Sequence, residues 1–312
     1  MKKYIFALVA YVAFTSPLLA LEEEELIWDH PQPSVQEYNS SLQQAIAAGD
    51  WWTVIDYADI ISYNFPSSPF AQEVSYIMGE AYFKLNQLEY ANECFTAYLN
   101  HASAPKHFED AIEYKFNIAE QFATGAKKRL FGSPKMPAWL PAKEDSIQIY
   151  DDVIAALPHS EFAAKSLLSK ARTQTYFEDF KPAIETLDLL IRRFPKHDLA
   201  AEGYLEKNKI YLLQCQAQNL DPDVLDLTEV NLRKFRLAFP REPRLVEAEK
   251  IHSEMQEIFA ENLFEIGHFF ERTKKIPASV IYYKKVIAKY PNTEAAAVSR
   301  DKLQSLEVPN QS

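Results

Sequence analysis

The side chains that could carry out chemistry in this chain are histidines, cysteines and carboxylates, and they form no catalytic pattern. The acidic pairs Glu109–Asp110 and Asp151–Asp152 are adjacent in the sequence, so on a helix they diverge by about 100° and are interpreted as solvated surface. There is no Gly-x-Ser-x-Gly, His-Glu-x-x-His, glycine-rich phosphate loop or Cys-x-x-Cys motif. The histidines are scattered along the chain: His30, His101, His107, His159, His197, His252 and His268. We therefore expect no enzyme activity and no cofactor.

The two cysteines, Cys94 and Cys215, are predicted to be buried thiols rather than a disulfide. Each has apolar neighbours, and they fall in different repeats of a fold in which a repeat touches mainly its neighbours. No cysteine or histidine pair has the spacing of metal ligands, so no metal site is expected.

The elements that position these side chains are helices that end in a recurring stop, a bulky residue followed by proline. Proline lacks an N–H and disfavours helical geometry in the residue before it, so it ends a helix. Candidate N-caps for the next helix follow at Ser68, Ser160, Asp198 and Thr293. The stops are Phe65–Pro66, Leu157–Pro158, Phe194–Pro195, Phe239–Pro240 and Tyr290–Pro291, with a looser Ala104–Pro105.

Small residues recur at fixed distances before these stops. Gly267 and Ser279 precede the proline at 291 by the same distances as Ala171 and Ala183 precede the proline at 195, and small residues there let antiparallel helices approach closely. Self-similarity near a period of ~34 residues is typical of tetratricopeptide repeats. No stretch alternates as a strand would, and glycines number only 6. The fold is therefore predicted to be all-α, an α-solenoid of about six tetratricopeptide-like helix pairs, some with insertions.

The first 20 residues are predicted to be a secretory signal peptide. Lys2 and Lys3 form a basic start, an apolar core follows, and the region before Ala20 has the layout of a cleavage site. The core is too short for a comfortable membrane span of about 20 residues, although an uncleaved anchor is the alternative. We divide the chain into this signal peptide (1–20), a flexible acidic segment (21–33), the solenoid (34–306, insertion at 123–143) and a disordered tail (307–312).

The net charge of −11 narrows the range of partners. An acidic chain disfavours general binding to nucleic acids or to anionic lipids. With 47% hydrophobic residues the chain can bury a large core and is not disordered. Since solenoids usually bind other chains, we expect protein partners and no nucleic acid.

The first helix of each pair is predicted to line the concave side, where exposed side chains would form a partner-binding groove. In the first three pairs the candidate residues are Tyr38, Gln43, Tyr76, Glu80, Phe83, Glu113 and Phe116. Aromatic rings among hydrogen-bond acceptors suit an extended or helical segment of a partner. Alternatively several of these rings belong to the core, Tyr76 and Phe116 foremost.

The insertion at 123–143 is a second candidate contact because it carries basic residues beside aromatic ones. Phe131 and Trp139 are its candidate partner-binding residues, for a protein or a membrane surface. Alternatively these two rings pack the insertion onto its own solenoid.

Two stretches of the chain carry a family resemblance. The first, residues 38–122, includes Ala47–Trp51 and Phe65–Gln72, and the second runs through Gly267–Ile281 to Tyr290–Thr293. They resemble the N-terminal repeats and the last repeat of the BamD family, the tetratricopeptide subunits of the outer-membrane β-barrel assembly machine in diderm bacteria. Repeat patterns are shared by many solenoids, so the resemblance rests on the ordered combination with an export signal.

The resemblance implies a non-enzymatic periplasmic scaffold at the inner face of the outer membrane, which binds assembly subunits or unfolded barrel segments. The sequence departs from the family where its lipoproteins carry an acylated cysteine, because Leu21 follows Ala20 here. No lipid anchor is therefore expected, and membrane association would occur through partners. The alternative function is a periplasmic repeat adaptor of cell-wall or envelope-constriction machinery.

Overall fold

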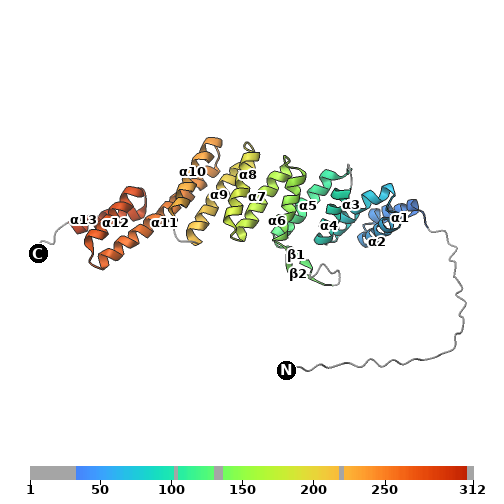
Figure 1. Cartoon of the computed structure of the whole chain (residues 1–312), viewed down its shortest axis with the longest axis horizontal. Helices are drawn as coiled ribbons and strands as arrows, with labels where there is room; N and C mark the ends of the chain where they lie inside the picture. Colours follow the sequence, from blue (N-terminus) through green and yellow to red (C-terminus); the bar gives the residue numbers. More distant parts are fainter. Residues whose placement is uncertain (1–32, 102–104, 130–135, 218–220, 308–312) are drawn as a thin grey trace, which may run out of the picture.

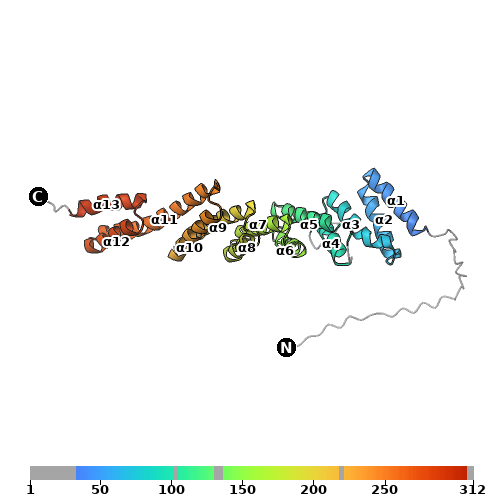
Figure 2. The same ribbon diagram turned by 90° about the horizontal axis from the view of Figure 1, so that it is seen from above.

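A computed structural model describes residues 33–101, 105–129, 136–217 and 221–307. The predicted signal peptide, all but the last residue of the acidic segment 21–33, and Phe131 lie outside these residues, as does the tail from residue 308 onward. The described helices form an elongated array with the first and the last helix at opposite ends (Figures 1 and 2). None of them combines the length and the apolar character that crossing a bilayer requires.

The helices follow one another as antiparallel pairs. Their bounds are α1 (Val35–Ala48), α2 (Trp51–Asn64), α3 (Pro69–Lys84), α4 (Leu88–His101), α5 (Phe108–Ala123), α6 (Asp145–Ala156), α7 (Glu161–Tyr176), α8 (Phe180–Arg193), α9 (Asp198–Ala217), α10 (Pro222–Ala238), α11 (Arg244–Arg272), α12 (Ile276–Lys289) and α13 (Glu294–Glu307). Consecutive helices pack on each other, and α5, α7, α9 and α11 also contact one another in sequence. Over the described residues the chain is therefore an all-α solenoid of helix pairs, as predicted, with six pairs followed by α13.

The helix ends confirm the predicted stops. At Phe65 the backbone leaves helical geometry (φ −130°, ψ 51°) while its N–H still donates to the Ile61 carbonyl at 3.0 Å, and Tyr290 ends α12 in the same way. The predicted caps Ser68, Ser160 and Thr293 each accept an N–H from the first turn of the following helix.

The cap predicted at Asp198 is wrong by one residue. Asp198 is already the first residue of α9, and the preceding His197 accepts the Leu199 N–H through Nδ1 at 3.1 Å.

Close approach between paired helices occurs where glycines were predicted to permit it. A Cβ added to Gly267 would lie 2.9 Å from the ring of Tyr283, and one added to Gly79 would lie 2.7 Å from the ring of Phe95. Ala171 is buried at the equivalent position of another pair. These aromatic rings fill the space that the missing side chains leave, so in the pairs α3–α4 and α11–α12 one small and one large residue fix the packing.

Neighbouring pairs are joined by buried lysines that we call the lysine rungs. In each rung a lysine on the first helix of a pair reaches a residue 19 positions earlier, on the second helix of the preceding pair. The rungs are Lys115–Thr96 (2.5 Å), Lys170–Asp151 (2.6 Å) and Lys207–Asp188 (2.6 Å). Their lysine side chains are only 2%, 17% and 9% exposed. The ammonium groups are tolerated there because each is paired and hydrogen-bonded: Lys170 and Lys207 with the aspartates of their rungs, and Lys115 with Asp152 at 3.1 Å.

The insertion contains two strands, although no strand was predicted. β1 (Lys127–Arg129) pairs antiparallel with β2 (Ala138–Pro141), with a register irregularity after Lys128. Strands of three and four residues are too short to show an alternating pattern in the sequence. The hairpin is held to the solenoid by Lys128, whose Nζ donates to both carboxylate oxygens of Asp145 at 2.6 and 2.7 Å.

Candidate functional site

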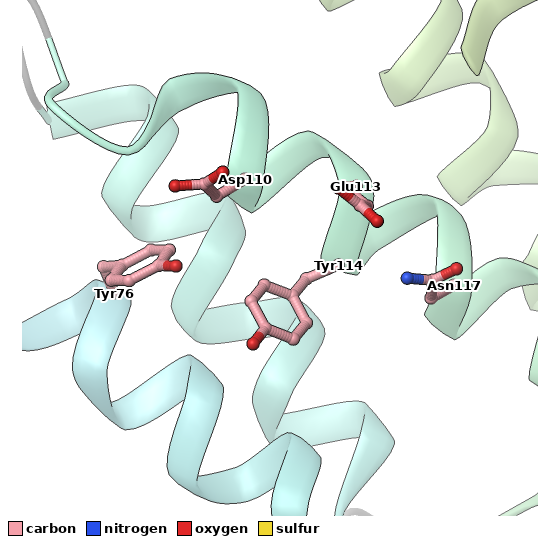
Figure 3. A pocket seen from close by; sticks show the side chains of 5 residues that line it. All are labelled: Tyr76, Asp110, Glu113, Tyr114 and Asn117. Atoms are coloured by element: carbon pink, nitrogen blue, oxygen red, sulfur yellow. The ribbon is translucent and has the colours of Figure 1, made fainter.

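A pocket of about 240 Å³ lies between α3 and α5, on the side of the solenoid formed by the first helices of the pairs. Tyr76 enters it from α3, while Asp110, Glu113, Tyr114 and Asn117 come from α5 (Figure 3). The four α5 residues are spaced i, i+3, i+4 and i+7, so they share one face of that helix. Local sequence thus places two carboxylates, a phenol and an amide side by side.

Tyr114 holds this pocket together. Its ring stacks on Phe95 with centroids 4.9 Å apart and meets Phe83 edge-on at 5.0 Å, so it joins α3, α4 and α5. Its hydroxyl donates to Oε1 of Glu80 at 2.8 Å. Burial and the neighbouring Glu80 raise the pKa of Tyr114 above its ordinary value, so the phenol stays protonated and keeps donating. Glu80 is thereby fixed beside the pocket as a half-buried acceptor.

The predicted contact Tyr76 belongs mainly to the core. Only 7% of the residue is exposed, because its ring stacks on His107 at 4.5 Å and packs against Phe95 and Tyr98 at 5.8 and 5.4 Å. It therefore offers the pocket a small part of its surface, as the alternative interpretation had it.

Phe116 is also held by packing, in this case toward the next pair. Its ring lies 6.3 Å from that of Tyr150 on α6 and 5.7 Å from that of Phe162 on α7. The structure thus places Phe116 between α5, α6 and α7 and not in the pocket.

Carboxylates give the pocket its charge. Asp110 and Glu113 are exposed, and Glu80 lies behind Tyr114. His107 approaches Asp110, with Nδ1 and Oδ2 3.2 Å apart. Such a pocket can accept an ammonium or guanidinium group, with the Tyr114 ring beside it for a cation–π contact.

The same face of α5 continues to a second pocket, of about 380 Å³, between the ends of α5 and α7. Glu120 and Thr124 extend the spacing of Glu113 and Asn117 into it. The character of the surface changes there, because Lys143 lies over the Tyr176 ring with its Nζ 3.7 Å from the centroid. The face of α5 thus carries carboxylates at the first pocket and approaches a cation, Lys143, at the second, and we call the surface with these two pockets the groove.

Tyr38 and Gln43 lie on α1, away from this pocket. The Tyr38 ring packs within its own pair, 6.4 Å from Tyr57 and 6.1 Å from Phe65, and Gln43 is exposed. Sequence position alone predicted these two residues to share a surface with the others.

The hairpin presents Trp139 to solvent. The Trp139 side chain is 58% exposed on β2, so it does not pack the insertion onto the solenoid. Arg129 does that instead: its N–H donates to Glu89 at 2.7 Å and its guanidinium to Gln87 at 2.5 and 2.9 Å. Trp139 remains a candidate contact.

Both cysteines are free thiols, Cys215 buried and Cys94 half-buried. Burial raises the pKa of Cys94 to about 12 and raises that of Cys215, so neither is an activated nucleophile. Within the described ranges, no three His, Cys, Asp or Glu side chains are grouped so that they could hold a metal ion.

Asp110, Tyr114 and Asn117 were not predicted as site residues. Their spacing with Glu113 was visible in the sequence, but a helical face can equally turn toward the core. The direction of α5 depends on the packing of Tyr114 against α3 and α4, which is a tertiary contact.

No family model and no curated protein sequence matches this chain. Solved structures with a similar fold include YrrB, a TPR protein with an unusual peptide-binding site, at 10% identity over 70% of this chain and 92% of that one, with a TM-score of 0.38. A tetratricopeptide repeat protein from Parabacteroides merdae covers 86% of this chain and 97% of its own at 13% identity, with a TM-score of 0.36. The TPR2AB domain of yeast Sti1 in complex with pHSP90 is 12% identical over 72% of this chain and 86% of its own, with a TM-score of 0.31. These likenesses carry no argument about what this chain binds.

Proposed function

We propose that this protein is a non-enzymatic scaffold whose groove along α3 and α5 binds a segment of a partner protein that carries a basic side chain. The observation that carries the proposal is the pocket in which Asp110 and Glu113 stand open to solvent beside Tyr114, with Glu80 fixed behind it. Around it, residues 34–123 hold twelve acidic and three basic residues, a net charge of −9. This field attracts a basic segment before contact is made.

The dimensions of the groove suggest the length of that segment. From Glu113 to Thr124 the helix rises about 16 Å, at 1.5 Å per residue. An extended chain covers this distance in about five residues, at roughly 3.3 Å each. A basic residue at one end and an acidic or polar residue near Lys143 at the other would match the change of charge along α5.

The finer part of the proposal is that these segments come from outer-membrane β-barrel proteins or from the subunits that assemble them. Its support is the resemblance of residues 38–122 to the N-terminal repeats of the BamD family, since this stretch contains the whole first pocket. The accompanying location, the periplasmic side of the outer membrane without a lipid anchor, rests on the sequence alone. Cell fractionation and the intact mass of the mature chain test it, and an acyl mass increment would contradict it.

The test of the groove is binding of the full chain to an array of peptides from outer-membrane β-barrel proteins and their assembly subunits. Glu113→Lys should weaken binding of the best basic peptides at least tenfold, because it replaces attraction with repulsion at an exposed position. The matched control is Glu93→Lys, which makes the same change of charge at an exposed position on α4. Circular dichroism establishes that both variants fold.

Equal weakening by the two variants would show a general charge effect and would remove the groove from the proposal. Retention of binding by Glu113→Lys would move the contact to another surface, and the hairpin around Trp139 would be examined next. Capture from envelope extracts separates the two families of partner: assembly subunits support the proposal, whereas cell-wall or constriction proteins support the adaptor function.

A further inference from the structure

The stretch that contains α12 and the turn before it carries a charge opposite to that of the chain as a whole. Between Glu271 and Glu294 there is no acidic residue, while six basic residues give this stretch a net charge of +6 in a chain whose total is −11. These residues, with Ile281, form what we call the basic face: Arg272, Lys274, Lys275, Ile281, Lys284, Lys285 and Lys289.

The basic face points away from the solenoid. Ser279, Tyr283 and Val286 are buried on one side of α12, so residues half a turn away, Ile281 and Lys285 among them, lie on the opposite side. All six basic residues are exposed, and Ile281 is 64% exposed in their midst. On α12, Ile281 lies one turn before Lys284 and Lys285, and most of its surface is free of packing contacts.

The six cations form no ion pair with any part of the chain that the structure describes. Lys275 and Lys289 only approach rings, at 6.0 Å from Phe270 and 5.5 Å from Tyr290. Two glutamates of α11 are engaged elsewhere. Glu271 accepts from Tyr283 at 2.6 Å and pairs with Lys302, while Glu257 accepts two N–H groups at the start of α13. These two glutamates therefore do not serve as counter-charges for the basic face.

We propose that the basic face docks on the surface of an anionic lipid bilayer. Lysine predominates, five to one over arginine. Interfaces between proteins are depleted in lysine and enriched in arginine, which binds carboxylates in a directed, bidentate way. Lysine on a flexible stem suits a diffuse layer of headgroups, and an exposed isoleucine among lysines can enter the boundary between headgroups and acyl chains.

The rest of the molecule favours one orientation on such a surface. The acidic helices α1–α5 and the basic α12 lie toward opposite ends of the elongated array (Figure 1), so an anionic surface attracts one end and repels the other. This inference is independent of the proposed groove, because it uses a different helix pair and a different charge.

The experiment is co-sedimentation of the full chain with vesicles of phosphatidylcholine alone or of phosphatidylcholine with phosphatidylglycerol. The apolar stretch at 4–14 can enter both, so the measured quantity is the ratio of the two partition coefficients. Lys284→Gln combined with Lys285→Gln should lower this ratio at least tenfold, given about 1 kcal/mol for each lysine near an anionic surface. Ile281→Ser should weaken partitioning into the anionic vesicles without changing the net charge.

The control is Lys181→Gln combined with Lys196→Gln, two exposed lysines in other pairs, which changes the net charge equally. It should leave the ratio within about twofold of the unaltered chain. Equal losses in both double variants would assign the effect to net charge and overturn the proposal. The proposal would also be overturned if the unaltered chain showed no preference for anionic vesicles. The basic face would then be tested as a binding surface for an acidic protein. Thermal melts of all variants exclude unfolding as the cause.

Discussion

Individual residues in the groove serve packing and recognition at once. Tyr114 packs on Phe95 and Phe83 and also fixes Glu80 through its hydroxyl. Replacing Tyr114 would therefore disturb three helices and one candidate contact together. Glu113, which is exposed and has no such structural role, is the position at which binding can be tested apart from folding.

At this scale the clearest stability prediction concerns Gly267. Gly267→Leu should lower the free energy of unfolding by about 1–3 kcal/mol, since even a Cβ there would lie 2.9 Å from the Tyr283 ring and 3.2 Å from Cβ of Tyr282. Denaturant unfolding measures the loss. Gly203→Ala is the control, because its Cβ would come no closer to any neighbour than 3.3 Å, the distance to Cδ2 of Leu190. An unchanged midpoint for Gly267→Leu would contradict the packing of α11 on α12.

The sequence predicted the residues at which paired helices approach closely, but it predicted the residues of the groove only in part. Gly267 was found because its distance to the following proline repeats in another pair. Tyr76 and Phe116 were placed in the groove by position within a helix. Their burial depends on partners such as His107 and Phe162, which lie in other helices or loops and follow no repeat.

Among the elements, the junction between the first two pairs lacks a lysine rung. Asp59 occupies the position of the acidic partner, but the residue 19 positions later is Met78. Partial desolvation of the carboxylate and the nearby Asp56 raise the pKa of Asp59, although the residue as a whole is exposed. An acid with a raised folded-state pKa weakens folding at neutral pH, and the penalty disappears as the pH falls below the pKa of the unfolded chain.

Met78→Lys should therefore complete a fourth rung. The pKa of Asp59 is expected to fall, and stability at neutral pH to rise by at most about 1 kcal/mol, because Asp59 is exposed. Titration of Asp59 by NMR measures the change. Met78→Gln, of similar length but uncharged, is the control and should leave the pKa raised. A lysine variant with the same Asp59 pKa as the control would show that the rung geometry does not extend to this junction.

The elements themselves were largely predictable because their signals are local. Proline stops, small residues and caps act within a few positions of where they stand, so six helix pairs followed from the sequence. The hairpin β1–β2 did not, since its strands are short and its position depends on Arg129 and Lys128 reaching α4 and α6. The rungs were also missed, because an isolated lysine in a helix ordinarily faces water.

The molecule as a whole is a chain of local cores. One cluster of buried residues spans α1–α3, a second runs from α3 to α9 and a third from α9 to α13. Each pair contacts mainly its neighbours, so stability is expected to be a sum of pair and junction contributions.

Destabilisation should consequently remain local. In Gly267→Leu, amide hydrogen exchange is expected to quicken in α11–α13 and to stay unchanged in α1–α4, which share no core cluster with it. Exchange measured by mass spectrometry on peptic fragments gives both values in one experiment. Faster exchange throughout would mean that the solenoid unfolds as one cooperative unit.

At the scale of the whole molecule, the net charge does not describe how the charge is distributed. The total of −11 disfavours binding to anionic lipids only if the charge is spread evenly, and it is not: residues 34–123 carry −9 while 272–289 carry +6. Electrostatic inference for an elongated molecule has to be made segment by segment, because exposed charges farther apart than a Debye length are largely screened from each other.

Because the lysine rungs have a constant spacing, a whole helix pair can be removed without changing the spacing at the junction that remains. Residues 159–195 begin after one proline stop, Pro158, and end at the next, Pro195. Removing them would place Lys207 19 positions after Asp151, which is the spacing that each now has with its own rung partner. The junction created by the deletion would inherit a matched ion pair. Such a chain can lose or gain whole helix pairs through recombination. The length of the solenoid then changes while the ion pairs at its junctions are kept.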